Sequence, residues 1–397
     1  MAHGAQDGAA RDPYDYFALR LDGDMRRRIA DFWAHFAGHA EELDAVFSSG
    51  QGDRLGRSLE IMEALRRVSP DLMWEFGPSQ IGHRLVITAE WNHDLIPLAR
   101  AVCRAAPSFE RFQIGGVRHG DPDRDNFKRN FEARFRRPLT IEGISCAPGF
   151  AGLIEYRLTG RGSVDDLEEQ GDCLLSMIMG EQCERDWAGL PSAERRGSGL
   201  LGRLKGRGPV IAPDAVVQAF TAAIEQAEAA LPGRPLSQIP LDTREMGLMQ
   251  VSNLPEDHPR ADLIVYATPS ERFAEAVLRP GLFSSRAQSR FGEWFCALRI
   301  ERTPEHPFNQ PDDRYALEEV LHEALAPPGL GGVAGGGHGQ EAVYIDLALS
   351  DIEAGLSALA RAVGAQGLAK AAELRFLDKG VNERPIRIGE LTAGQIS

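Results

Sequence analysis

Glycine-rich residues 329–339 are the segment of this sequence best suited to hold a small anion. Gly335, Gly336 and Gly337 stand in a row before His338. Consecutive glycines let backbone N–H groups converge on a negative charge, as they do in phosphate-binding loops. The run leads into a predicted strand and not into a helix, so the contexts of the Walker and Rossmann motifs are absent. A connection between two strands is therefore the interpretation we favour, and an anion-binding loop is the alternative.

Two polar side chains share one face of the strand that follows the glycines. In residues 342–349, alternation puts Tyr344 and Asp346 on the face opposite the apolar side chains. If their face is open, they could form a polar patch with His338. Polar residues usually occupy the solvated side of a sheet, so we expect these two at the surface.

Two arginines, Arg286 and Arg290, precede a strand predicted at residues 293–300. Guanidinium groups bind carboxylates and phosphates through paired hydrogen bonds, so an anionic ligand is one interpretation of these residues. Pairing with a neighbouring acid such as Glu293 is the commoner arrangement. The candidate ligand-binding residues of the sequence are therefore Gly335, Gly336, Gly337, His338, Tyr344, Asp346, Arg286 and Arg290.

The motifs of hydrolases and of metal sites are absent from the sequence. It contains no G-x-S-x-G, no H-E-x-x-H and no metal-like His/Cys spacing, and its five cysteines form no C-x-x-C pair. Asn92-His93-Asp94 precedes a predicted helix, where Asn or Asp serves as the N-cap. A catalytic His–Asp pair there would also need a nucleophile or a metal. The sequence thus identifies no catalytic residue, and we expect neither a bound metal nor a cofactor.

The elements that carry these residues recur three times in the order α-β-β-α-β. Apolar residues at three- and four-residue steps predict the helices, and alternating runs bounded by turn residues predict the strands. One more strand precedes the last copy, which gives the β-α-β-β-α-β order of a ferredoxin-like unit near residues 290–380. The predicted segments are 54–68, 72–76, 83–89, 95–106 and 109–117, then 126–135, 139–146, 153–158, 164–179 and a short strand near 187, then 315–325, 331–334, 342–349, 352–363 and 371–377.

The fold class that follows is α+β, with repeated ferredoxin-like α-β-β-α-β units, antiparallel or mixed sheets, and helices on one face. The 397 residues exceed the roughly 250–300 that a single core supports. Residues 193–213 are rich in glycine and arginine and interrupt the periodic pattern, which predicts a linker. We therefore expect a flexible tail at 1–23, an N-terminal domain of two units at 24–192, and a C-terminal domain at 214–397.

The chain is acidic, with a formal net charge of −14 and a pI near 5.3. Binding to nucleic acid or to an anionic membrane depends on a cationic surface, so the charge disfavours both as partners. Five basic residues lie in the linker, where we expect them to keep that segment solvated rather than to contact RNA or an acidic partner. No apolar run reaches the roughly 18–20 residues that cross a bilayer. The first 20 residues are acidic and polar rather than basic and then apolar, so we expect no export. We expect a cytoplasmic protein.

Three short motifs resemble a poorly characterised family of bacterial proteins of unknown function. They are Trp74-Glu-Phe-Gly77, Phe291-Gly-Glu-Trp-Phe295, and the stretch from Gly335-Gly-Gly-His-Gly339 to Tyr344-Ile-Asp-Leu-Ala-Leu349. The similarity covers roughly residues 25–380 and implies a small α+β fold. It implies no catalytic residue and no activity.

Two hypotheses of function follow from these observations. The first is a non-enzymatic bacterial binding or regulatory protein with a protein partner. Because this chain is negatively charged, the partner that complements it best has a basic surface. Toxin-neutralising immunity proteins have this profile, because they mask a basic active site by electrostatic complementarity. The alternative is an enzyme that binds a small molecule or nucleotide through residues 335–339 with Tyr344 and Asp346. The oligomeric state is not predicted.

Limited trypsin digestion tests the predicted organisation. We expect the first cuts within residues 193–213, because arginines on an unpatterned segment are the most accessible sites. Mass spectrometry of the early fragments locates the cuts. Preferred cleavage within residues 72–117 would contradict the prediction.

Overall fold

A computed structural model of the chain describes residues 12–50, 52–121, 123–195, 211–279, 281–306, 308 and 310–391. The chain divides between residues 118 and 119 into two compact units, and residues 380–383 belong with the first unit. The sequence instead predicts a boundary at residues 193–213, of which 196–210 lie outside the described residues. The helix that follows this segment packs into the same core as the strands that precede it, so the second unit continues across the predicted linker.

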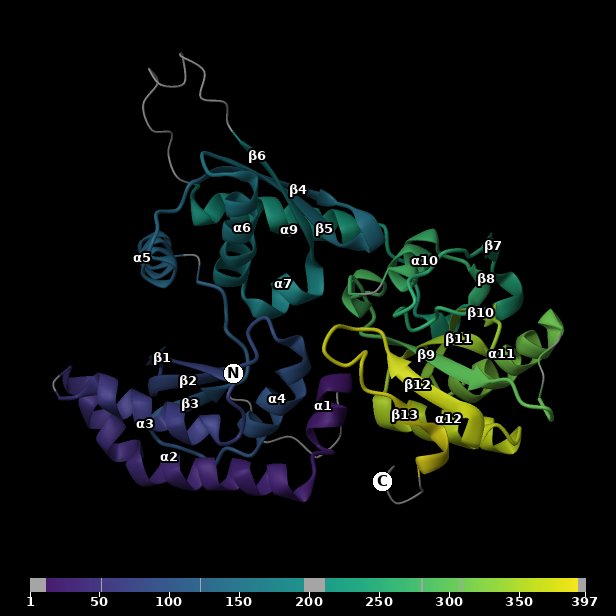
Figure 1. The fold of residues 1–397 in the computed structure, drawn as a ribbon, viewed down its shortest axis with the longest axis horizontal. Helices are drawn as coiled ribbons and strands as arrows, with labels where there is room; N and C mark the ends of the chain where they lie inside the picture. The colour runs from purple at the N-terminus through teal and green to yellow at the C-terminus, as the bar shows by residue number, and fades with distance from the viewer. Residues whose placement is uncertain are drawn as a thin grey trace, which may run out of the picture. The chain divides into compact units, whose positions relative to one another are not determined.

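In the first unit two helices, α1 (Pro13–Ala18) and α2 (Gly23–Ser49), precede one α-β-β-α-β copy. Figure 1 shows α2 and α3 along the small sheet of this copy and α1 beside α4. The sheet has the order β1-β2-β3, with β1 antiparallel to β2 and β2 parallel to β3. Aromatic residues of α2 fill the core, and the Trp33 indole N–H donates to the Val102 carbonyl at 2.7 Å. The elements are α1 (Pro13–Ala18), α2 (Gly23–Ser49), α3 (Arg54–Arg66), β1 (Met73–Ser79), β2 (Gly82–Thr88), α4 (Ile96–Arg104) and β3 (Phe112–Gly115).

The predicted tail at residues 1–23 is wrong for its second half, which contains α1. The Asp12 side chain accepts from the Asp15 N–H at 2.9 Å and caps the helix, while Tyr14 and Tyr16 are buried. Arg100 pairs with both Asp12 and Asp15 and ties the helix to α4. The buried tyrosines and these ion pairs hold residues 12–18 in a fixed structure, although the composition of the segment predicts disorder. Residues 1–11 lie outside the described residues.

The second unit begins with another α-β-β-α-β copy, as predicted. Its sheet has the order β4-β5-β6, with β4 antiparallel to β5 and β5 parallel to β6, which is the pairing of the first copy. The expected short strand near residue 187 is β6. The elements are α5 (Arg124–Phe135), β4 (Ile141–Pro148), β5 (Ile154–Gly160), α6 (Val164–Met179), α7 (Glu181–Trp187), β6 (Ala188–Arg195) and α9 (Pro213–Ala229).

A seven-stranded antiparallel sheet forms the rest of the second unit, with the order β13-β12-β9-β11-β10-β8-β7. This mixture of helices with antiparallel and mixed sheets confirms the α+β class. The elements are β7 (Gly247–Gln250), β8 (Leu263–Thr268), α10 (Glu271–Leu278), β9 (Trp294–Glu301), α11 (Pro311–Leu325), β10 (Gly331–Gly339), β11 (Ala342–Leu349), α12 (Ile352–Ala365), β12 (Ala372–Phe376) and β13 (Ile386–Arg387).

The predicted β-α-β-β-α-β order occurs in β9-α11-β10-β11-α12-β12, but a repeated ferredoxin-like unit is not confirmed. These four strands lie in the order β12-β9-β11-β10 within a wider sheet, whereas the two earlier copies form separate three-stranded sheets with a parallel pair. Nor do the helices of the large sheet lie on one face. Phe273 of α10 packs on Phe295, whereas α11 meets the opposite face at Gly336.

The glycine run is a strand near the middle of this sheet, so both interpretations of it as a connection and as an anion-binding loop are wrong. β10 pairs with β11 on one side and with β8 on the other. A Cβ at Gly335 would lie 2.7 Å from the Ala267 carbonyl oxygen, and one at Gly337 would lie 2.5 Å from the Val265 carbonyl oxygen. Glycine is required here because neighbouring backbone comes too close for any side chain.

Gly336→Ala tests the close packing of β10. The new Cβ would lie 2.5 Å from both the Tyr344 carbonyl oxygen and the Arg314 Nη1 atom. We expect the free energy of unfolding to fall by about 1–3 kcal/mol, as in other overpacked cores. Urea denaturation measures it. Gly364→Ala in α12 is the control, because its Cβ meets nothing within 4 Å, and an equal loss in both variants would contradict the explanation.

Candidate functional site

Tyr344 and Asp346 are buried, so their predicted surface position is wrong. Asp346 is fully buried and accepts hydrogen bonds from both terminal nitrogens of Arg260 and from the Tyr266 hydroxyl, the last at 2.7 Å. The Tyr344 hydroxyl donates to Asp262. Arg260 and Asp262, which precede β8, therefore cover this face of the sheet and pair with Asp346 and Tyr344 of β11. The network satisfies its own charges, which identifies it as a structural element.

His338 does not join Tyr344 and Asp346. In the strand register His338 is paired with Val343 and Gly337 with Tyr344, so the His338 side chain lies on the opposite face. Burial, and then the charges of Arg314 and Arg302, lower the pKa of His338 to about 4. The imidazole is therefore neutral near pH 7 and is not a cation for an anionic ligand.

Arg286 and Arg290 occupy separate positions. The Arg286 guanidinium lies over the Trp294 ring, 5.2 Å from its centroid. Arg290 donates to the Leu231 carbonyl at 3.0 Å and to the Pro232 carbonyl at 3.2 Å. Neither forms the predicted contact with Glu293. Arg290 instead holds in place a segment that lines a cavity.

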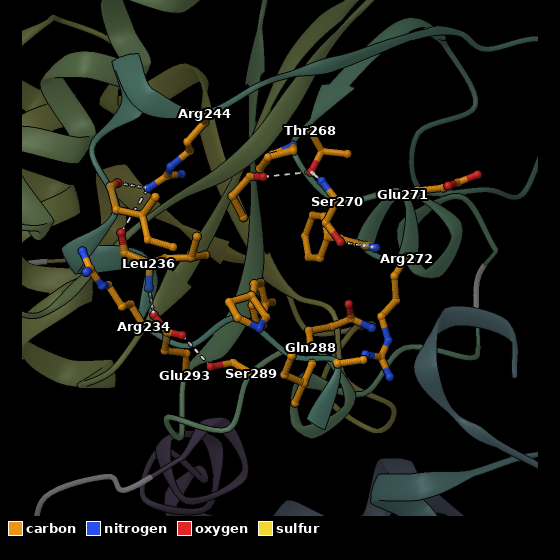
Figure 2. A pocket seen from close by; sticks show the side chains of 18 of the residues that line it. Arg234, Leu236, Arg244, Thr268, Ser270, Glu271, Arg272, Gln288, Ser289 and Glu293 are labelled. Atoms are coloured by element: carbon orange, nitrogen blue, oxygen red, sulfur yellow. Dashed lines mark hydrogen bonds between the residues drawn. The ribbon is translucent and has the colours of Figure 1, made fainter. Parts of the chain in front are cut away.

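This cavity, of about 580 Å³, is a candidate functional site of the second unit. Four stretches distant in sequence form it: residues 230–244, the start of α10, residues 288–295 and the middle of β10. Figure 2 shows Arg244 and Leu236 on one side and Ser270 and Arg272 on the other, with Ser289 and Glu293 between them at the base of the view. A void of this size lies within the range of ordinary ligand pockets. The apolar part of its lining comprises Ala230, Leu231, Pro232, Leu236, Ile239, Pro269, Phe273, Phe295 and Ala334.

Arg244 and Glu293 hold the 230–244 wall against the sheet. Arg244 donates to the carbonyl oxygens of Val333, Leu236 and Ile239, which lie in β10 and in the wall. The Glu293 carboxylate accepts from the Leu236 N–H at 2.7 Å and from the Ser289 hydroxyl at 2.5 Å. The wall contains little regular secondary structure, so these side chains supply the hydrogen bonds that a helix or sheet would otherwise provide.

The opposite wall is the N-terminus of α10. The Ser270 hydroxyl caps this helix by accepting from the Phe273 N–H at 3.1 Å, and the Thr268 hydroxyl donates to the Ala334 carbonyl at 3.0 Å. Arg272 donates to the Gly152 carbonyl at 3.1 Å and to the Ala227 carbonyl at 3.4 Å. Its guanidinium is therefore fixed by backbone groups beside the cavity.

Burial perturbs the charged groups of the lining. Desolvation lowers the pKa of Arg244 and of Arg272 and raises the pKa of Glu293. Each arginine is therefore less stable as a cation than it would be in water. The lining contains hydroxyl, amide, guanidinium and carboxyl groups, and among the described residues it includes no histidine, cysteine or lysine. Such a set can bind ligands through hydrogen bonds and charge, and its one hydroxyl–carboxylate contact, Ser289 with Glu293, is part of the hydrogen bonds that hold the 230–244 wall.

A buried polar stripe on α11 lies against β10. Arg314 and Glu318 form an ion pair at 2.9 Å and are almost fully buried. The paired atoms, Arg314 Nη1 and Glu318 Oε1, lie close without the geometry of a hydrogen bond. Within the described part of the chain, Arg314 Nε, His322 Nδ1 and, on the facing strand β10, His338 Nε2 have no hydrogen-bond partner. Burial raises the pKa of Glu318 to about 7, despite the nearby charges of Arg314 and Arg244.

Across the residues that the structure describes, no three His, Cys, Asp or Glu side chains are placed to hold a metal ion. In the same part of the chain, no helix combines the length and the apolar character needed to cross a membrane.

Reasoning from the sequence missed the cavity. It selected Arg286 and Arg290 but neither Arg244 nor Arg272, which lie in segments without a motif. Two signals were present: the proline-rich run Pro232 to Pro240, and the polar residues that directly follow the β8 strand. Neither signal is specific enough to identify a ligand site.

Comparison with known proteins adds no relative. No protein-family model matches the chain, and no curated protein or solved structure matches it either. The resemblance to an uncharacterised bacterial family therefore stays a prediction, and the function has to be argued from the site.

The buried Glu318 carboxyl predicts a pH-dependent stability. Its pKa is raised from 4.5 to about 7, so its contribution to stability is fully present below about pH 4.5 and is lost as pH rises through 7. We expect Glu318→Gln to reduce the fall in unfolding free energy between pH 5 and pH 8. Urea denaturation at several pH values measures this. Glu319→Gln, on the exposed side of α11, is the control, and parallel pH profiles for wild type and Glu318→Gln would refute the assignment.

Proposed function

We propose that this protein binds a small organic molecule in the cavity of its second unit and acts as a binding or regulatory protein rather than as an enzyme. The cavity itself carries the proposal: about 580 Å³, an apolar floor and a few convergent polar groups. The absence of histidine, cysteine and lysine from the described lining favours binding over catalysis. A protein partner, which the acidic charge suggests, acts in this proposal through the surface and not through the cavity.

A second candidate function is binding of a protein partner at the edge of the large sheet. β7 is an edge strand, and the side chain of Leu248 on it is 71% exposed, with Met246 and Ile264 also exposed nearby. Edge strands with apolar side chains pair readily with a strand of another chain. This observation favours the immunity-type hypothesis, in which the ligand is a protein.

A thermal-shift screen separates the two candidates. We expect some members of a panel of neutral, cationic and anionic organic molecules to raise the melting temperature saturably, because a ligand at 100 times its Kd stabilises the native state by about 2.7 kcal/mol. Ala334→Leu places extra carbons in the cavity and should abolish the shift. Ala230→Trp, at an exposed position of the lining, serves the same purpose without changing the core.

The control for the screen is Leu248→Ser on β7, which leaves the cavity unchanged. Shifts that persist in both cavity variants, or no shift with any molecule, would refute small-molecule binding. Co-purification of a protein that is lost with Leu248→Ser would then support the second candidate.

A further inference from the structure

Two arginines of the cavity are cations without an acidic partner. Neither Arg244 nor Arg272 forms an ion pair with a carboxylate among the described residues, and both donate to backbone carbonyl oxygens instead. The Nε atom of Arg244 is buried and has no hydrogen-bond partner within the described structure. A third arginine, Arg234, is exposed at the lining. A buried cation without a counter-charge is costly, and an anion in the cavity would relieve that cost.

The acids near these arginines do not supply the missing charge. Glu293 uses its carboxylate on the Leu236 N–H and the Ser289 hydroxyl. The charges of Glu293 and Glu318 favour the cationic form of Arg244, and that of Glu275 favours the cationic form of Arg272, but burial outweighs them and the pKa of each arginine is lowered. Glu271, the other acid of the lining, is exposed. The chain as a whole has a net charge of −14, whereas the lining of this cavity has more arginines than glutamates. The cavity therefore has the opposite sign of charge to the protein.

The apolar part of the lining favours a ligand with an apolar body. Leucine, isoleucine, proline and phenylalanine side chains form much of the lining to which Arg244 and Arg272 belong. An inorganic anion would leave this apolar surface in contact with water, whereas an organic anion would cover it. The N-terminus of α10, eight residues long, adds a favourable potential for negative charge at the Arg272 side.

We infer that the ligand of the cavity is an amphipathic organic anion, with its charged group between Arg272 and Arg244 and its apolar body on the Leu236, Ile239 and Phe295 surface. This inference rests on the proposed function and specifies its ligand class. A molecule with one negative charge fits best, because the lining holds three arginines and two glutamates. Multiply charged nucleotides fit less well for the same reason.

A matched pair of fluorescent probes tests the inference on the whole protein. The first is 8-anilinonaphthalene-1-sulfonate, which is an aromatic monoanion, and the second is N-phenyl-1-naphthylamine, which has the same body without the sulfonate. We expect the sulfonate to bind at least about tenfold more tightly, as charge-assisted hydrogen bonds predict. Sodium sulfate at the same ionic strength as a chloride control should not displace it.

Variants locate the charged group. Arg272→Gln removes a cation beside the charged group and should weaken binding of the sulfonate severalfold while leaving binding of the neutral probe unchanged. Arg234→Gln removes the third positive charge of the lining and should weaken the sulfonate in the same direction, also without an effect on the neutral probe. Arg234 is exposed, so this variant reports even if Arg272→Gln fails to fold. Arg361→Gln, exposed on α12, is the matched control and should change neither probe.

The outcomes separate the proposed binding function of the cavity from the inferred class of its ligand. If neither probe binds in a way that Ala334→Leu blocks, the proposed cavity function fails. If both probes bind equally, or if the arginine variants weaken both to the same extent, the cavity binds small molecules but the inferred anionic ligand is overturned.

Discussion

The close packing of the glycine strand β10 is the constraint on which the second unit depends. Gly335 and Gly337 have no room for a Cβ against β8, and Gly336 has none against the Arg314–Glu318 pair. Because this strand carries almost no side chains, one face of the sheet can accept a buried ion pair of α11. The other face can accept two tyrosines with Arg260 and Asp346. A larger side chain at these positions would push β10 away from β8 and from the ion pair of α11.

The same constraint shapes the cavity. Small residues in β10 leave space above the strand, and Ala334 lines that space. The 230–244 segment closes it from the side, held by hydrogen bonds from Arg244 and to Glu293. These two charged side chains satisfy backbone groups in a wall that has little secondary structure. They therefore set the shape of the cavity, and Arg244 also contributes to its positive charge.

The buried charges divide into two kinds. Arg260 and Asp346 neutralise each other within hydrogen-bond distance, so they stabilise one arrangement of the sheet and leave nothing for a ligand. Arg244 and Arg272 meet only carbonyl oxygens, which carry partial charges, and their cationic form is weakened by burial. An arginine whose charge is neutralised by a carboxylate has a structural role, whereas an arginine bonded only to carbonyl oxygens can still bind an anion.

The sequence alone determined the α+β class, the α-β-β-α-β order of the first two copies and the β-α-β-β-α-β order of the last, because hydrophobic periodicity is a local property of the chain. It also placed Tyr344 and Asp346 correctly on one face of a strand. Only the tertiary structure decided that residues near Arg260 cover this face, that the glycines form a strand, and that Arg244 and Arg272 line opposite sides of one cavity. The physical reason is distance along the chain: alternation shows which side chains share a face, but burial and charge pairing depend on segments tens of residues away.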